Sequence, residues 1–456
     1  MALKSINPAT LEVIAEFKEF DNTLITQKIE CAQSTYKSWK NTNFSDRAQL
    51  MHQAATFLRD NSTEFAYIIS TEVGKTLKAA KAEVLKSALV CDYYADNTES
   101  ILKPEVIKSD ASESYVEFDP IGIVLAIMPW NFPFWQVFRF AAPTLMAGNV
   151  GILKHASNVQ KSAAAIEDIF TKVGFPPGAF TNLAIGSSKV ETVINDERIK
   201  AVTLTGSEKA GSIVASQAGR ELKKTVLELG GSDPFIVLED ADIDTACMVA
   251  VSARMQNNAG QSCIAAKRFI VHKNIAAEFT NKLKIELEKL TIGDPLDDNT
   301  KIGPLATEQM LLDIQQQVND SVKMGATILS GAEKPNIKGY YYAPTILTNV
   351  VKGMPAYDQE LFGPVIPIII VNSESEAIRV ANDSIYGLGA TIFSQNISKA
   401  KQMATKIESG CVFINNQVTS DPRLPFGGIK KSGYGRELSS YGIKEFVNIK
   451  TVYIIS

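Results

Sequence analysis

One cysteine of the chain stands in a setting that suits nucleophilic chemistry. The segment NNAGQSC (257–263) places Cys263 after a polar turn that contains Gly260, at the start of an apparent strand. A loop of small residues lets a substrate approach closely and exposes backbone N–H groups, which a thiolate and a developing oxyanion both need. Free cysteines are more often small buried hydrophobes, so a structural Cys263 is the alternative. The other cysteines lack such flanks: Cys31, Cys91, Cys247 and Cys411.

Two further polar residues lie in apolar surroundings and could serve the same reaction. Glu228, in VLELGG (226–231), ends an apolar strand just before a Gly-Gly turn. It is either a surface charge at a strand end or a carboxylate in an apolar pocket, where a raised pKa would make it a base near neutrality. Asn131, in PWNFP (129–133), either caps a turn or points its amide at an oxyanion.

A single arginine is the only charge in a long uncharged stretch. Residues 120–153 carry no charge except Arg139. A guanidinium in such surroundings needs an anion, and its partner is either an acid brought in by the fold or a carboxylate on the substrate. Several prolines and Gly148 interrupt the stretch and exclude a continuous lipid-exposed helix, so we predict buried strands and turns around a site.

A glycine-containing turn suggests a place for a phosphate. The segment TLTGSEKAG (203–211) reads as a strand, a tight turn and the start of a helix, with Gly206 and Gly211 spaced for close approach of the backbone. Helix N-termini attract phosphate groups. The segment is not a GxGxxG fingerprint, and alone it is weak evidence for a dinucleotide.

The elements that must position these residues alternate along most of the chain. Apolar spacing predicts helices near 22–39, 46–72 and 76–101, and strands at 113–118, 121–128, 149–154, 180–185, 201–205 and over the last ten residues. Ser157 and Gln160 resemble a capping box that starts the helix after 149–154. A second alternating unit spans about 229–431. Such βαβ alternation predicts parallel sheets covered by helices.

Composition limits the class of protein. The 456 residues are 45% hydrophobic with a net charge of −4 and no basic run, which favours a globular protein with a small-molecule partner over one that binds nucleic acid. Five scattered cysteines without a CxxC pair argue against a disulfide framework and a zinc ribbon, and we expect no metal. The first residues lack the pattern of a signal peptide, and we expect a cytoplasmic protein with no membrane association.

Taken in series, these segments resemble the aldehyde dehydrogenase superfamily over nearly the whole chain. The matching motifs are PWNFP, LK (153–154), TGSxxxG, LELGG, GQxC, ELFGPV (360–365) and PFGGIKKSG (425–433). The resemblance implies an α/β, aldehyde dehydrogenase-like fold with two parallel-sheet domains and a small β bridging element, assembled as a homodimer or homotetramer. The implied parts are a Rossmann-like dinucleotide-binding domain (1–101 and 120–228), a catalytic domain (229–431) and the bridging element (102–119 and 432–456).

The same resemblance implies roles for individual residues. Cys263 is the nucleophile and forms a thiohemiacetal, whose oxyanion is held by the Asn131 side chain and the Cys263 backbone N–H. Glu228 activates the water that hydrolyses the later thioester, and its presence favours a free acid over transfer to coenzyme A. The implied cofactor residues are Ser207 with Gly206 and Gly211 at the pyrophosphate, Glu360 and Phe362 at the nicotinamide ribose, Lys154 at the adenosine ribose, and Trp130.

Three features of the sequence depart from the pattern of the superfamily. Ser157 stands three residues after Lys154, where members that use only NAD⁺ commonly carry a glutamate. A neutral residue beside a lysine would not repel a 2′-phosphate, so we predict that NADP⁺ is preferred and NAD⁺ possible; the alternative is that Ser157 only caps a helix. Phe140 replaces a common lysine, which puts a proton relay there in doubt. Ile264 and Ala265 follow Cys263, so a disulfide switch at the nucleophile is not expected.

The substrate is suggested by two segments in particular. WNFPFWQVFRF (130–140) and NNQVTSDPRLPFGG (415–428) resemble the succinate-semialdehyde dehydrogenase branch, in which an arginine and a serine bind the far carboxylate. Carried over, these are Arg139 and Ser420. We therefore predict oxidation of succinate semialdehyde or a similar short ω-carboxyl aldehyde. The alternatives are a dehydrogenase for glutarate semialdehyde, an aminoaldehyde or a broad aliphatic set, and a non-enzymatic binding protein, against which the complete catalytic set argues.

Overall fold

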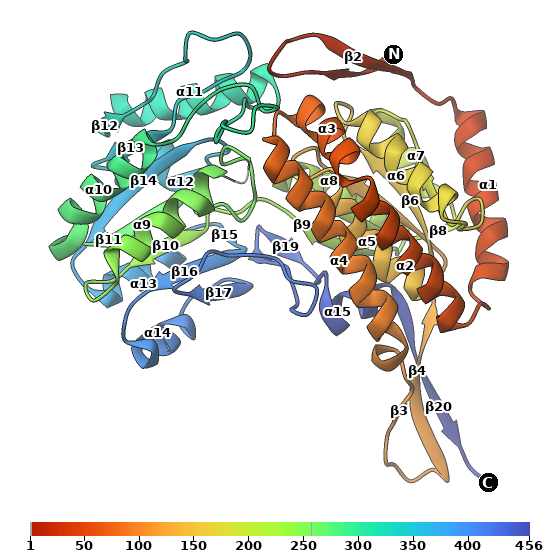
Figure 1. Ribbon diagram of the computed structural model, residues 1–456. Helices are drawn as coiled ribbons and strands as arrows, with labels where there is room; N and C mark the ends of the chain where they lie inside the picture. Colours follow the sequence, from red (N-terminus) through yellow and green to blue (C-terminus); the bar gives the residue numbers. More distant parts are fainter. Residues whose placement is uncertain (1, 257) are drawn as a thin grey trace.

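The computed structural model describes residues 2–256 and 258–456 of the chain. Two α/β units lie side by side, and a slender antiparallel sheet projects away from them toward the C-terminus (Figure 1). Asn257, which opens the predicted nucleophile loop, lies outside the described residues. Within them, no helix combines the length and the apolar character needed to cross a membrane.

The first unit is built on a six-stranded sheet with the order β19-β9-β8-β5-β6-β7. Five strands are parallel, and short β19 pairs antiparallel with β9. The strands are β5 (Ile123–Met128), β6 (Val150–His155), β7 (Phe180–Asn182), β8 (Ile199–Thr205), β9 (Lys224–Glu228) and β19 (Gly433–Tyr434). The helices are α1 (Asn22–Trp39), α2 (Phe44–Asp60), α3 (Ser62–Val73), α4 (Leu77–Ile101), α5 (Trp135–Met146), α6 (Gln160–Lys172), η1 (Ser187–Lys189), α7 (Val190–Asn195) and α8 (Glu208–Arg220).

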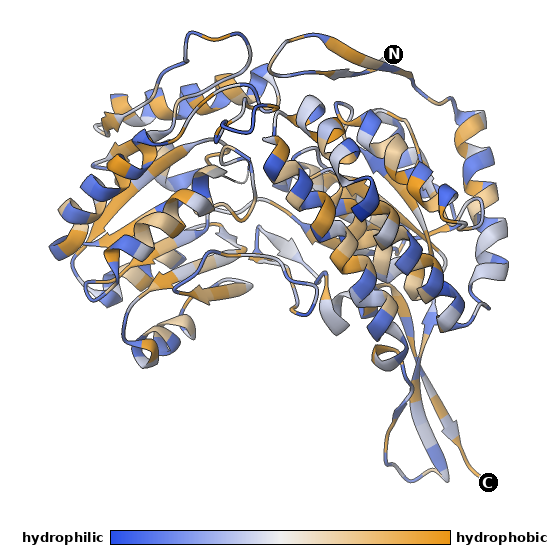
Figure 2. Ribbon diagram, viewed as in Figure 1, coloured by the Kyte–Doolittle hydropathy of each residue, from blue (hydrophilic) through white to orange (hydrophobic). Residues whose placement is uncertain are grey.

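The second unit is built on a seven-stranded sheet with the order β12-β13-β14-β11-β10-β16-β17, parallel except where β12 meets β13. Its strands are β10 (Pro234–Val237), β11 (Arg268–His272), β12 (Thr327–Ser330), β13 (Thr345–Thr348), β14 (Val365–Val371), β16 (Gly389–Phe393) and β17 (Cys411–Ile414), with a separate pair β15 (Tyr386–Gly387) and β18 (Ile429–Lys430). Its helices are α9 (Ile243–Val251), η2 (Ser252–Gln256), α10 (Lys273–Glu288), α11 (Glu308–Lys323), α12 (Pro355–Asp358), α13 (Glu374–Asn382) and α14 (Ile397–Ala404). Figure 2 shows its strands as mostly apolar and its outer helices as half polar, as expected for a sheet buried under helices.

The third sheet joins the middle of the chain to its last residues. Strand β4 (Glu113–Pro120) lies between β3 (Glu105–Val106) and β20 (Val447–Ile454), and all pairs are antiparallel. Helix α15 (Ser439–Ile443) and η3 (Lys444–Phe446) lead into β20. Val106, Ile449 and Tyr453 are exposed on this sheet, so its apolar side chains are left uncovered by the chain itself.

Residues 2–18, for which no element was predicted, form a hairpin of β1 (Ala2–Ile6) and β2 (Val13–Lys18). Two expectations about the N-terminal half are wrong. The helix expected over 46–72 is two helices that meet at Asn61. The stretch 120–153 is not strands and turns alone, since α5 occupies its middle. All twelve residues of α5 are buried, so the helix has no polar face to reveal its period in the sequence.

The capping box expected at Ser157 is also wrong. Helix α6 begins at Gln160 with Val159 at its N-cap, and no side chain caps it. The Gln160 Nε2 amide instead donates to the Ala156 carbonyl at 2.9 Å. Ser157 is exposed in the turn after β6, and its hydroxyl is therefore free to face a ligand.

Candidate active site

The topology of the first sheet brings several predicted residues to one edge. Asn131 follows β5, Gly206 and Ser207 follow β8, and Glu228 ends β9. Lys154 and Ser157 lie at the end of β6. Because these four strands are parallel neighbours, their carboxyl ends share an edge, which is where α/β sheets bind ligands.

The loop that carries Cys263 is held in shape from within. Cys263 lies in a turn, not at the start of a strand as expected, and β11 begins only at Arg268. Gly260 has a φ of +76°, and a Cβ there would lie 2.2 Å from the Gly363 carbonyl oxygen, so only glycine fits. The buried Lys267 ammonium donates to three carbonyls of the loop: Ser262 at 2.8 Å, Cys263 at 2.7 Å and Ala265 at 3.3 Å.

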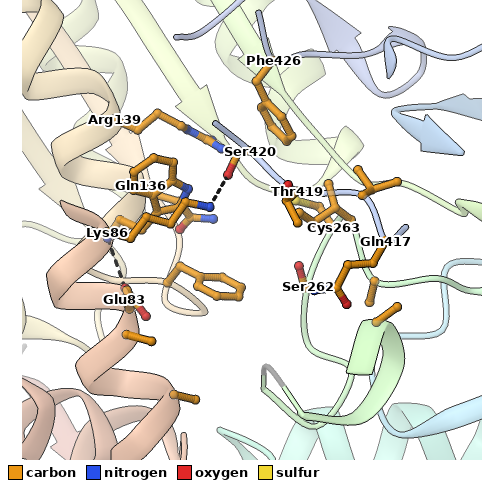
Figure 3. A pocket seen from close by; sticks show the side chains of 18 residues that line it. Glu83, Lys86, Gln136, Arg139, Ser262, Cys263, Gln417, Thr419, Ser420 and Phe426 are labelled. Carbon is orange, nitrogen blue, oxygen red and sulfur yellow. Dashed lines mark hydrogen bonds between the residues drawn. The ribbon is translucent and has the colours of Figure 1, made fainter. Parts of the chain in front are cut away.

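Two cavities meet at Cys263. The first, here called the Arg139 cavity, has a volume of about 170 Å³ and is lined among others by Lys86, Trp135, Arg139, Cys263 and Ser420 (Figure 3). The second, the Glu360 cavity, has about 240 Å³ and is lined by Pro129, Trp130, Asn131, Gln136, Thr205, Gly206, Ser207, Leu229, Gly230, Cys263, Met310, Glu360 and Phe362. Cys263 and Gln136 line both, so one thiol can contact two different ligands at once.

The side-chain amide of Asn131 is fixed by neighbours. Its Nδ2 donates to the Gln261 carbonyl at 3.0 Å, and its Oδ1 accepts from Gln136 Nε2 at 3.1 Å. An amide nitrogen carries two N–H groups, so one remains for a ligand. The buried amide therefore presents a preorganised donor in the Glu360 cavity, next to the thiol.

Burial controls the acidity of the thiol. Desolvation raises the pKa of Cys263 to about 11, while the nearby charges of Lys267 and Arg139 act in the opposite direction. The ligand-free protein therefore holds Cys263 as a neutral thiol at pH 7. As long as the pH stays below this pKa, each increase of one pH unit raises the fraction of thiolate tenfold.

The acidity of Cys263 can be measured by alkylation. We expect the rate at which iodoacetamide inactivates the ligand-free enzyme to rise steadily from pH 7 to pH 10, because only the thiolate reacts. Cys31→Ser is the background for this measurement, since Cys31 is exposed and would also react. A rate that levels off below pH 8 would show instead that Lys267 and Arg139 hold a thiolate.

Glu228 is buried but does not line either cavity. Its carboxyl group lies over Gly427, where a Cβ would come within 2.6 Å of Glu228 Oε1, and neither oxygen has a hydrogen bond among the described residues. Burial raises its pKa well above the ordinary value, and Glu437 raises it further, while Arg139 and Arg436 oppose the shift. Of the two interpretations left open by the sequence, the structure shows the buried carboxyl.

Arg139 finds its anion within the fold. Its Nε pairs with the buried carboxylate of Glu437, its Nη2 donates to Thr205 Oγ1 at 3.4 Å, and its guanidinium lies 4.9 Å from the centre of the Phe426 ring. Glu437 is far from Arg139 in the sequence, which explains why no partner could be named. This ion pair gives Arg139 a counter-ion in the absence of a substrate.

The predicted nicotinamide residues do gather around one cavity. Glu360 Oε1 accepts from the Gly231 N–H at 3.1 Å and pairs with Lys267 at 3.2 Å. A Cβ on Gly230 would lie 2.5 Å from Glu360 Oε2, so that glycine makes room for the carboxylate. Phe362 packs edge to face with Trp130, with ring centres 5.9 Å apart.

The predicted phosphate turn has the expected form. Ser207 is the N-cap of α8, and its Oγ accepts from the Ala210 N–H at 3.3 Å. A Cβ on Gly211 would lie 2.6 Å from Leu229 Cδ2, so glycine lets α8 approach the sheet. Lys154 and Ser157 lie outside the lining of this cavity.

Two lysines of the site were missed by sequence reasoning. Lys267 directly precedes the buried strand β11, which begins at Arg268, and two adjacent cations before an apolar run were a signal that could have found it. Lys86 lies on α4 and donates to Ser420 Oγ at 2.8 Å. Its place in an Ala-, Lys- and Glu-rich helix gave no sign that it lines a cavity with Cys263.

Comparison with known proteins identifies the family. The model of the aldehyde dehydrogenase family matches residues 1–452. The chain is 52% identical to a probable NADP⁺ succinate-semialdehyde dehydrogenase of Synechocystis sp. and 48% identical to succinate-semialdehyde dehydrogenase [NADP(+)] 1 of Mycobacterium ulcerans, with both chains covered in full. The crystal structure of succinic semialdehyde dehydrogenase from Streptococcus pyogenes with NADP⁺ matches with a TM-score of 0.98 at 42% identity over the whole of both chains. The expected fold is confirmed, and the chain belongs to the aldehyde dehydrogenase family.

Proposed function

We propose that this enzyme oxidises succinate semialdehyde, or a similar short ω-carboxyl aldehyde, to the carboxylic acid with NADP⁺ in preference to NAD⁺. The observation that carries the proposal is a single thiol at the junction of two cavities, one of which has basic side chains at its far end. A volume of about 170 Å³ is small for a ligand site and suits a short substrate. The NADP⁺ succinate-semialdehyde dehydrogenases among the relatives support the same reaction.

The residues divide the chemistry between them. The Cys263 thiol gives its proton to water, its sulfur attacks the aldehyde carbon, and the free N–H of the Asn131 amide stabilises the oxyanion of the thiohemiacetal. When bound, the nicotinamide cofactor supplies the acceptor for the hydride that leaves this carbon. Cys263 then carries a thioester, which water must hydrolyse.

Glu228 is the proposed base for that hydrolysis. A base must reach the attacking water directly or through one further water, so its carboxyl group must turn from Gly427 toward Cys263 for this step. Its raised pKa suits a group that takes a proton near neutral pH.

The residues of the Glu360 cavity fit a dinucleotide. Glu360 can accept from ribose hydroxyls, Ser207 lies at a helix N-terminus that suits a pyrophosphate with Gly206 and Gly211, and Phe362 and Trp130 form an apolar wall. The Lys154 ammonium makes no hydrogen bond or ion pair within residues 2–256 and 258–456, and Ser157 nearby is exposed and neutral. A 2′-phosphate would meet an unpaired ammonium there and no repelling carboxylate.

Introducing a carboxylate at position 157 should reverse the cofactor preference. We expect Ser157→Glu to lower kcat/KM for NADP⁺ by about 10- to 100-fold, because the new charge repels the 2′-phosphate at close range. The value for NAD⁺ should stay equal or rise. Ser157→Gln is the matched control, since it has the same length without the charge. An equal loss with both cofactors would show that position 157 is remote from the 2′-phosphate.

Assembly and location are part of the proposal. The exposed apolar side chains of the β3-β4-β20 sheet suit contact with a second copy of the chain, so we infer a homodimer or homotetramer. The far carboxylate is assigned to the end of the Arg139 cavity, where Arg139 and Ser420 lie. The five free thiols suit the reducing cytoplasm.

The proposal is tested by steady-state kinetics. Absorbance at 340 nm should report the highest kcat/KM for succinate semialdehyde with NADP⁺, among succinate and glutarate semialdehydes, an aminoaldehyde and butanal with each cofactor. A higher value for butanal or the aminoaldehyde would overturn the substrate assignment. Higher values with NAD⁺ would overturn the cofactor assignment alone.

A further inference from the structure

The charges that line the Arg139 cavity do not balance. Three of its described lining residues are charged: Glu83, Lys86 and Arg139. Glu83 is neutralised by the buried Lys75, and its other oxygen accepts from the backbone N–H groups of Phe134 at 2.9 Å and Trp135 at 3.1 Å.

Arg139 is likewise neutralised, by the carboxylate of Glu437. Lys86 remains, and it forms no ion pair within the described part of the chain. Asp421 is an acid near it, but both Asp421 oxygens accept from the Arg423 guanidinium, at 2.9 and 2.6 Å. One positive charge is therefore left over in the cavity, on Lys86.

The position of Lys86 is set by neutral groups. Its ammonium donates to Ser420 Oγ at 2.8 Å and lies 4.3 Å from the centre of the Trp135 ring. Figure 3 shows the Lys86 and Ser420 side chains meeting near Arg139, with Cys263 toward the opposite side. The remaining N–H groups of an ammonium, which has three, are left for a ligand.

We propose that Lys86 is the residue that selects a substrate with a remote carboxylate, receiving it together with Ser420, while Arg139 mainly serves as the counter-ion of Glu437. The inference rests on the proposed oxidation of an ω-carboxyl aldehyde. A carboxylate bound to Lys86 restores neutrality in the cavity, whereas one bound to Arg139 must compete with Glu437. Lys86 and Cys263 together then fix the distance between the two ends of the substrate.

The pKa of Lys86 provides a test that distinguishes substrate binding from a structural role, because a structural lysine would not change the preference between two aldehydes as it titrates. Burial lowers its pKa to about 8, with the charges of Arg139 and Lys75 in the same direction and those of Asp421 and Glu83 opposing. The ratio of kcat/KM for succinate semialdehyde to that for butanal should therefore fall as the pH rises past about 8. The titration of Cys263 affects both aldehydes and cancels in the ratio.

Substitution tests the assignment directly. Lys86→Met should lower kcat/KM for succinate semialdehyde by about 10- to 100-fold, chiefly through KM, and leave butanal essentially unchanged. Lys86→Arg should keep part of the preference, because it keeps the charge. Lys81→Met is the matched control on the same helix, since Lys81 is exposed and its ammonium donates to Thr63 Oγ1 on the neighbouring helix, away from the cavity lining.

The outcomes separate this inference from the proposed function. If the wild type does not prefer succinate semialdehyde to butanal, the proposed function falls and this inference with it. If the wild type shows the preference and Lys86→Met keeps it, or if the ratio is flat across pH 7 to 9, only the role of Lys86 is overturned. An equal loss for both aldehydes in Lys86→Met would assign Lys86 a structural role.

Discussion

Replacing Cys263 with alanine will abolish aldehyde oxidation, lowering kcat/KM at least about a thousandfold. Cys263 lines both cavities, and no other cysteine does. Without the thiol the aldehyde cannot be converted into a thiohemiacetal, and the donor on Asn131 has no oxyanion to stabilise. The measurement is the initial rate at 340 nm with succinate semialdehyde and saturating NADP⁺.

Loss of activity must be separated from loss of structure. The variant should melt at the wild-type temperature and still quench its tryptophan fluorescence with NADP⁺, since alanine leaves the loop contacts of Lys267 in place. Cys411→Ala is the matched control, because Cys411 lies on β17 outside both cavities and should retain full activity. Activity of Cys263→Ala above one part in a hundred would mean that oxidation proceeds without a covalent intermediate.

Replacing Glu228 with glutamine should separate the two halves of the reaction. The amide has the same size and is easily buried, but it cannot take a proton from water. We expect one equivalent of reduced cofactor per active site in a rapid burst, followed by turnover slowed by about 100- to 10,000-fold. Stopped-flow absorbance at 340 nm measures both phases.

The thioester that accumulates on Cys263 in the Glu228→Gln variant can be identified and released. Mass spectrometry should find one acyl group on the peptide that contains Cys263, and hydroxylamine should restore turnover by attacking the thioester in place of activated water. In the wild type, the hydrolytic step should accelerate with pH as Glu228 loses its proton, at a pH well above that of an ordinary carboxylic acid. A Glu228→Gln enzyme without a burst would place Glu228 in the first half of the reaction.

Local patterns in the sequence predict the helices and strands whose apolar residues recur at a regular spacing or form a clear run. They miss the elements in which no such pattern is visible. Strands such as β5 and β10 are uninterrupted apolar runs that the parallel sheets bury on both faces. Helix α5 is buried all round, so the pattern of its residues does not show a helical period and does not distinguish it from a strand. The positions of the domain boundaries stay predictions. Strand β19 (433–434), which falls within the segment predicted as part of the bridging element, pairs with β9 of the first sheet.

The site was predictable where its residues follow strands, and unpredictable where distant segments meet. Asn131, Ser207 and Glu228 were found because each follows or ends a strand of one sheet. The partners that decide the charges come from elsewhere: Glu437 reaches Arg139 from the C-terminal segment, and Lys86 reaches Ser420 from α4. Long-range pairing of this kind leaves no local signal, which is why the anion of Arg139 could not be named.

The short strand β19 gives the enzyme an order of assembly. Glu228 is enclosed by Gly427, by Gly433 pairing on β9 and by Glu437, all from the C-terminal part of the chain. The strands that hold the cofactor cavity and the thiol loop leave the ribosome earlier and can fold first. A nascent chain that stops before Gly427 therefore has its nucleophile but lacks the segment that encloses Glu228. The surroundings of the proposed base are the last part of the site to be synthesised.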